Sequence, residues 1–212
     1  MKVYLDKIRE PLKGNNLSKD IIITLAIMLT GFFLGLLQKW LDGGAYNDFP
    51  MILQKLDISN YFGRLGVWIL LGTSISVYSR SPLRAGINVF LFLLSMLTGY
   101  YLYSNYVLGF LPVFYMRFWI VIAFSSFFIA YICWYAKGKG IFAILISSII
   151  LGVLFSQAVL IFQGIRITHM LEFLTWIIGV LVLYRKPKEL ALEIGLSLIV
   201  ALFYQSYIPY FG

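Results

Sequence analysis

Seven long apolar stretches, separated by short connections, dominate this sequence of 212 residues. They occupy residues 21–39, 61–79, 82–103, 112–135, 140–162, 167–184 and 188–207. Each is close to the roughly 20 residues that a helix needs to cross a hydrocarbon core about 30 Å thick. The pattern therefore predicts an all-α fold, a polytopic bundle of seven transmembrane helices.

The composition supports a membrane location. The chain is 61% hydrophobic and only 12% charged, which leaves too little polar surface to cover a soluble globule. The apolar faces of the predicted helices must then lie against lipid, so the bilayer is the first partner that we expect.

The net charge of +8 is distributed unevenly along the chain. Twelve of the 17 lysines and arginines lie in the N-terminal segment, in the second, fourth and sixth connections between stretches, or in the first three residues of the stretch that follows such a connection. Basic residues concentrate on the cytoplasmic side of membrane proteins. The N-terminus is therefore predicted inside and the C-terminus outside. Because the charge is explained by orientation, no nucleic-acid partner is expected.

The charge and turn patterns also suggest a simple organisation. Residues 1–19 are predicted to form a cytoplasmic amphipathic segment, and residues 20–212 a single seven-helix transmembrane domain. The longest connection, 40–60, is predicted to lie outside and to include a short amphipathic helix. Cys133 is the only cysteine, so no internal disulfide and no cysteine metal site are expected.

Polar residues gather in the predicted outer half of the bundle. His169 and Glu172 lie three positions apart, on one face of the sixth helix, and Glu172 is about one turn below the interface. We predict an outward-facing polar and aromatic cavity here. Its expected ligand-binding residues are Arg64, Tyr101, Arg117, Gln157, His169, Glu172, Tyr204 and Gln205.

Structural interpretations of these residues stay open beside the functional one. Glu172 either pairs with Arg117 or contacts a ligand, because a carboxylate inside a membrane requires a cation or hydrogen-bond donors. The tyrosines also fit an interfacial aromatic belt, and the arginines could extend to headgroups. A His-x-x-Glu face can hold a metal only with a second set of ligands. We see none, and we predict neither metal nor cofactor.

Part of the sequence resembles a known group of proteins. Trp68, the tight turn Ser81-Pro82-Leu83-Arg84-Ala85-Gly86, and Gly99-Tyr100-Tyr101 at the end of the third stretch carry the resemblance. It is to an uncharacterised family of bacterial multispanning membrane proteins. The resemblance covers about half of the chain and implies a bacterial inner-membrane location, but no activity.

Three functions are compatible with these features. The first is a binding or transport protein for a small polar or amphipathic ligand that enters from outside. The second is an accessory subunit of a larger membrane complex, or a homodimer, joined through the small residues Ser148, Gly152 and Ser156. The third is a lipid-processing enzyme that uses His169 and Glu172. No enzyme motif is present, so no catalytic residue is predicted and the first function is favoured.

Overall fold

The computed structural model describes residues 6–12, 17–44, 49–162 and 164–208. The longer helices are α2 (Leu17–Gly43), α6 (Pro82–Tyr106), α7 (Val113–Cys133), the 3₁₀ helix η2 (Trp134–Lys137) that continues it, α8 (Ile141–Ala158) and α10 (Pro187–Tyr207). The shorter elements are α3 (Met51–Lys55), α4 (Ile58–Gly63), α5 (Leu65–Tyr78), α9 (Met170–Leu183), and the antiparallel strands β1 (Val159–Leu160) and β2 (Arg166–Ile167). The predicted helical fold is confirmed for these residues, with one two-residue ladder as the exception.

The helices identify a membrane protein. Five of them are long and apolar enough to cross a bilayer: α2, α6, α7 with η2, α8 and α10. The other two predicted crossings contain α5 and α9, which have 14 residues each. At 1.5 Å per residue such a helix extends about 21 Å, less than the core of about 30 Å.

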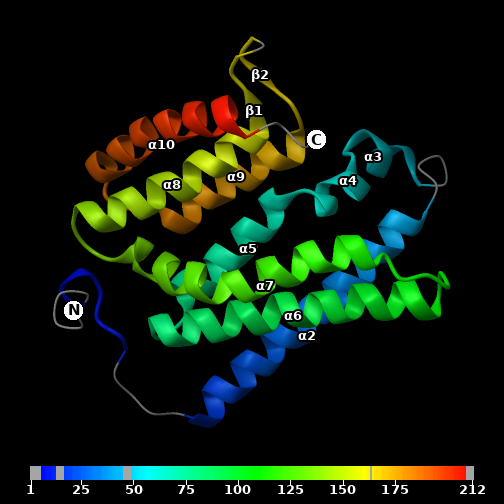
Figure 1. Cartoon of the computed structure of the whole chain (residues 1–212). Helices are drawn as coiled ribbons and strands as arrows, with labels where there is room; N and C mark the ends of the chain where they lie inside the picture. The colour runs from blue at the N-terminus through cyan, green and yellow to red at the C-terminus, as the bar shows by residue number, and fades with distance from the viewer. Residues whose placement is uncertain (1–5, 13–16, 45–48, 163, 209–212) are drawn as a thin grey trace.

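The helices form two groups with α5 between them (Figure 1). The first group consists of α2, α6 and α7, and the second of α8, α9 and α10. Helix α5 packs against α6 and α7 on one side and against α8 and α9 on the other. In each group one helix contacts the other two: α6 contacts α2 and α7, and α8 contacts α9 and α10. We call the α5–α9 contact region the junction.

Glycines hold the helices of each group close together. A Cβ atom at Gly35 in α2 would lie 2.0 Å from the Met96 carbonyl oxygen of α6, and one at Gly31 2.4 Å from that of Phe92. In the second group, a Cβ at Gly152 in α8 would lie 2.7 Å from the Ser197 carbonyl oxygen of α10. Such contacts allow only glycine, so the backbones pack directly. Gly152, from the small-residue seam predicted as a contact with another chain, thus packs against α10 of the same chain.

Two predicted helices are shorter than expected because distant side chains bind their free backbone groups. The 140–162 stretch is helical only to Ala158. Gln205 of α10 then donates to the carbonyls of Ser156 and Val159 and accepts from the Ile161 N–H. These bonds replace helical ones, and the chain continues as β1.

The 61–79 stretch is interrupted at Arg64, which has an extended backbone between α4 and α5 (φ −88°, ψ 158°). The carbonyl of Phe62 that this break frees accepts hydrogen bonds from Gln38 Nε2 at 3.0 Å and Trp68 Nε1 at 2.8 Å. The broken backbone is therefore satisfied by side chains, which is how irregular backbone is tolerated inside a bilayer.

The molecule has two different ends. The loop end contains α3, α4, β1 and β2. The N-terminal end contains residues 6–12 and the starts of α6 and α10 (Figure 1). Here Arg9 donates to the carbonyls of Val77 and Trp134, and its guanidinium lies 4.1 Å from the centre of the Trp134 ring. Of the predicted amphipathic segment 1–19, residues 1–5 and 13–16 lie outside the described part, and residues 6–12 contact the bundle.

Candidate functional site

A buried group of charged side chains lies where α5 and α9 begin. Arg64, at the break before α5, donates through Nε to Oε1 of Glu172 in the first turn of α9. Its Nη1 lies 2.9 Å from Asp57 Oδ2. His169 precedes α9, and its Nδ1 lies 3.8 Å from the same Asp57 oxygen. We call these four residues the Arg64 cluster.

Local structure places each member of the Arg64 cluster. Asp57 has a left-handed backbone (φ 52°), which aspartate tolerates better than most residues. It separates α3 from α4, and Asn60 Nδ2 donates to its other carboxylate oxygen at 2.7 Å. Beside the cluster, the hydroxyls of Tyr61 in α4 and Thr175 in α9 lie 2.7 Å apart. The cluster and this bond join α4 and α5 to α9.

The charges of the cluster do not cancel completely. Arg64 faces two carboxylates, so one formal positive charge meets two formal negative charges. Both Arg64 and Glu172 are buried. Within the described part of the chain, Arg64 Nη2 and Glu172 Oε2 have no hydrogen-bond partner. Unsatisfied charged atoms in an apolar interior are costly, so these two atoms are positions where a polar ligand could bind.

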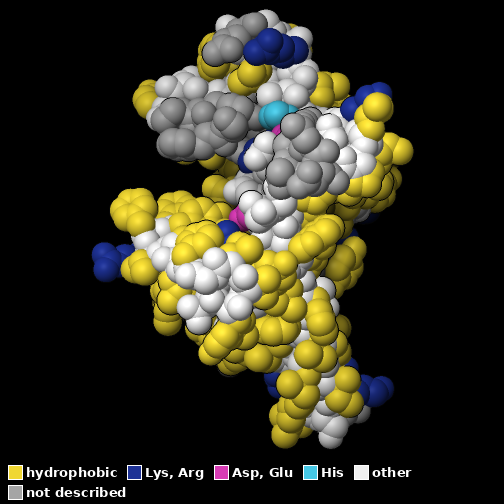
Figure 2. Space-filling view, turned by 90° about the vertical axis from the view of Figure 1, so that its right-hand side faces the viewer, with side chains coloured by type: hydrophobic (Ala, Val, Ile, Leu, Met, Phe, Trp, Pro, Cys, Tyr) yellow, Lys and Arg dark blue, Asp and Glu magenta, His cyan; other side chains and the backbone are white. Residues whose placement is uncertain are grey.

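The loop end covers the cluster only in part. Figure 2 views the molecule from the right-hand side of Figure 1. Yellow apolar side chains dominate this face, and the histidine and acidic side chains show as small patches between larger ones. The exposed fractions agree, because the side chains of Asp57 and His169 are about one quarter exposed whereas Glu172 is 1% exposed. Asp57 and His169 are therefore the more exposed members of the cluster, and Glu172 is buried beneath the surface.

A second polar group lies beside the first, between α8 and α10. Gln157 Nε2 donates to the Tyr204 hydroxyl at 3.5 Å, and Gln205 binds the backbone at the end of α8. A Cβ atom at Gly66, two residues after Arg64, would lie 4.0 Å from Gln157 Cβ. Gln157 thus lies close to the start of α5. Gln205 has a structural role in closing α8.

The remaining two predicted residues lie elsewhere. Arg117 is exposed on α7, and the partner of Glu172 is Arg64 instead. Tyr101 packs in an aromatic group with Tyr100 and Tyr115. Its hydroxyl is buried without a hydrogen-bond partner among the described residues.

Sequence reasoning missed Asp57, Tyr61 and Thr175. Asp57 belonged to a predicted amphipathic helix and Tyr61 to a predicted span, and neither residue has a spacing that indicates contact with α9. An aspartate close to the start of an apolar stretch is the one signal that could have identified Asp57. No group of three His, Cys, Asp or Glu side chains suited to hold a metal occurs among the described residues.

Comparisons with known proteins give no relative: no family model, no curated protein and no solved structure matches this chain.

Proposed function

We propose that this protein is an integral membrane binding or transport protein whose ligand acts at the Arg64 cluster. One observation carries the proposal: a charged pair is buried at the junction, and among the described residues each partner keeps one polar atom without a hydrogen-bond partner. Intramembrane charges of this kind are costly and commonly mark ligand or ion pathways. The pair also joins residues far apart in the sequence, on α5 between the groups and on α9 of the second group.

The two free atoms define the chemistry of the ligand. Arg64 Nη2 is a donor that suits a carboxylate, phosphate or hydroxyl oxygen. Glu172 Oε2 is an acceptor that suits an ammonium or hydroxyl group. A small molecule with both kinds of group, such as an amino acid or a polyol, fits the pair. Aromatic and apolar walls at the junction would accept its less polar part.

We further propose seven crossings in a bacterial inner membrane, with the N-terminus inside. The charge distribution supports this orientation, and the family resemblance supports the location. In this arrangement α4 extends α5, and the segment before α9 extends that helix, so that each short helix completes a crossing.

The orientation is testable by labelling introduced cysteines from outside intact cells, because the native Cys133 is buried. Ile165→Cys, at a position that is 85% exposed, should react with a membrane-impermeant maleimide, and Lys186→Cys should react only after lysis. The reverse result would overturn the orientation.

The ligand is testable with purified protein in nanodiscs. Amino acids, amines, carboxylates and polyols would be screened for compounds that raise the melting temperature. A compound that acts at the cluster should lose about tenfold or more in affinity with Glu172→Gln, because a hydrogen bond to a charged group contributes about 1.5–3 kcal/mol.

Arg117→Gln is the matched control, because Arg117 is an exposed arginine of the same half and lies outside the cluster. It should bind the compound as the unmodified protein does. A screen without any stabilising compound, or a compound that binds Glu172→Gln and the unmodified protein equally, would contradict the proposal.

A further inference from the structure

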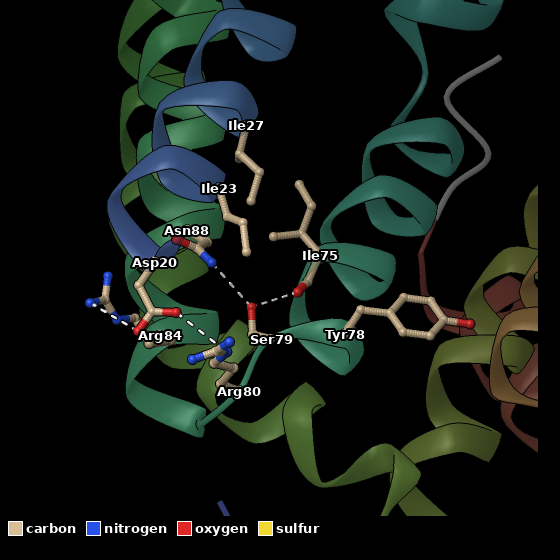
Figure 3. Close-up of a pocket in the computed structure, with 9 residues that line it drawn as sticks. All are labelled: Asp20, Ile23, Ile27, Ile75, Tyr78, Ser79, Arg80, Arg84 and Asn88. Carbon is tan, nitrogen blue, oxygen red and sulfur yellow. Dashed lines mark hydrogen bonds and ion pairs between the residues drawn. The ribbon is translucent and has the colours of Figure 1, made fainter. Parts of the chain in front are cut away.

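A cavity lies at the N-terminal end, away from the Arg64 cluster. It has a volume of ≈ 130 Å³ and lies between α2, α5 and the start of α6 (Figure 3). Helices α2 and α5 both pack on α6, and the cavity occupies the space between them. We call it the Arg80 cavity.

The polar part of the Arg80 cavity has an excess of positive charge. Arg80 Nε lies 3.4 Å from Asp20 Oδ1, and Arg84 Nη2 lies 3.5 Å from Asp20 Oδ2. Two guanidinium groups therefore share one carboxylate at long distances, and both remain about one third exposed. Each guanidinium has five N–H donors, so most of their donors are available to an anion at the mouth.

Hydrogen bonds of the neighbouring polar residues are already made within the protein. Asn88 accepts from Thr24 Oγ1 at 2.8 Å and donates to Ser79 Oγ at 3.2 Å. Ser79 in turn donates to the Ile75 carbonyl at 2.7 Å. Because Asn88 and Ser79 already make these hydrogen bonds, a polar group of a ligand would bind to the two arginines at the mouth of the cavity rather than to Asn88 or Ser79.

The rest of the lining is apolar. Ile23 and Ile27 of α2 face Ile75 of α5 across the cavity (Figure 3). Ile23 is 47% exposed, so this wall continues onto the outer surface of α2, a helix long and apolar enough to span a membrane. A ligand that fits both parts has an anionic head and an apolar chain that leads out into the bilayer.

We propose that the Arg80 cavity binds an anionic phospholipid, with its phosphate on Arg80 and Arg84 and its first acyl carbons along Ile23, Ile27 and Ile75. Arginine binds phosphate through paired N–H donors, and basic pockets between transmembrane helices bind anionic headgroups. Asp20 competes with the phosphate for the same two guanidinium groups. Inorganic phosphate would satisfy the arginines but not the apolar wall, so the lipid is the favoured occupant.

Native mass spectrometry of the purified protein tests this proposal. Phosphatidylglycerol and phosphatidylcholine with identical acyl chains would be added to separate samples. A third sample would contain inorganic phosphate in competition with phosphatidylglycerol. The unmodified protein should retain phosphatidylglycerol about tenfold better than phosphatidylcholine, since each arginine near the surface contributes to anionic lipid binding. Arg80→Gln/Arg84→Gln should lose that preference, and Asp20→Asn should increase it.

Lys186→Gln/Lys188→Gln is the charge-matched control, because both lysines are exposed at the same end and lie outside the cavity. It should keep the preference, and a normal melting temperature would show that each variant is folded. The proposal would be overturned if the arginine variant kept the preference for phosphatidylglycerol, or if the lysine control lost it to the same extent. It would also be overturned if inorganic phosphate competed equally with the lipid for the unmodified protein. The readout is lipid retention rather than ligand binding at Glu172, so the two proposals fail separately.

Discussion

The contacts within each helix group differ in kind from those at the junction between the groups. Within the groups, α2 packs on α6 and α8 on α10 through glycines that bring backbones into direct contact. At the junction, α5 and α9 are joined by the buried Arg64–Glu172 pair. Close packing has one well-defined arrangement, whereas an ion pair can exchange its partner for a ligand. The junction therefore differs from the glycine seams in containing a buried ion pair, beside apolar residues of α5, α8 and α9 that also pack there.

The strongest test of this contrast removes one charge from the junction. Glu172→Leu leaves Arg64 buried against Asp57 alone, and we expect it to reduce the free energy of unfolding by about 3–5 kcal/mol. The double variant Arg64→Met/Glu172→Leu should recover most of that loss, because an apolar pair of similar size requires no compensating charge.

The loss would be measured as a lower melting temperature in detergent, with a double-mutant cycle across the two positions. If Glu172→Leu alone were as stable as the unmodified protein, the pair would not connect the groups. An unchanged stability would also weaken the proposed binding site.

A second test changes a seam within the first group. Gly35→Ala places a Cβ atom 2.0 Å from the Met96 carbonyl oxygen, so α2 must move away from α6, at a cost of about 1–3 kcal/mol. Melting temperature is again the measurement. Gly195→Ala in α10 is the matched control, because its Cβ would meet no atom within 4 Å. A helical alanine there should be neutral or slightly stabilising. Equal effects at the two glycines would contradict the rigid-seam interpretation.

The smallest effect is expected for the other buried ion pair. Arg185 Nε lies 2.6 Å from Glu193 Oε1, but Arg185 also donates to the carbonyls of Ala136 and Gly138. Because the arginine keeps these partners, Glu193→Gln should cost about 1–2 kcal/mol, less than Glu172→Gln. Chemical denaturation of both variants compares them. If Glu193→Gln lowered the free energy of unfolding more than Glu172→Gln, ion pairs would contribute as much to stability inside a group as at the junction.

The helices could be predicted because long apolar stretches alone determine them. Each of the seven predicted stretches contains a helix, and α6, α7 and α10 begin within one residue of the predicted position. The ends that differ depend on distant side chains: Gln205 ends α8, and Arg64 interrupts the second stretch. Their hydrogen-bond partners lie more than forty residues away, beyond the reach of local sequence patterns.

Three of the four members of the Arg64 cluster could be expected from the sequence, whereas Asp57 and the pairing of the charges could not. His169 and Glu172 were expected together because they share a helix face, and they do lie in one cluster. The predicted ion-pair partner of Glu172, Arg117, is wrong, because apolar residues surround both α5 and α7 and give little indication of which face points inward. Arg117 faces outward, and Arg64 reaches Glu172 because the helix breaks there.

The position of Arg9 has a consequence for biosynthesis. Its guanidinium binds carbonyls of Val77 and Trp134, so the docking site of Arg9 is complete only when the ribosome has made residue 134. Residues 6–12 therefore dock fully only after α7 has been synthesised. Ile8, whose carbonyl accepts from the Lys139 N–H at 2.7 Å, must wait equally long. Assembly at this end therefore follows an order different from that of translation.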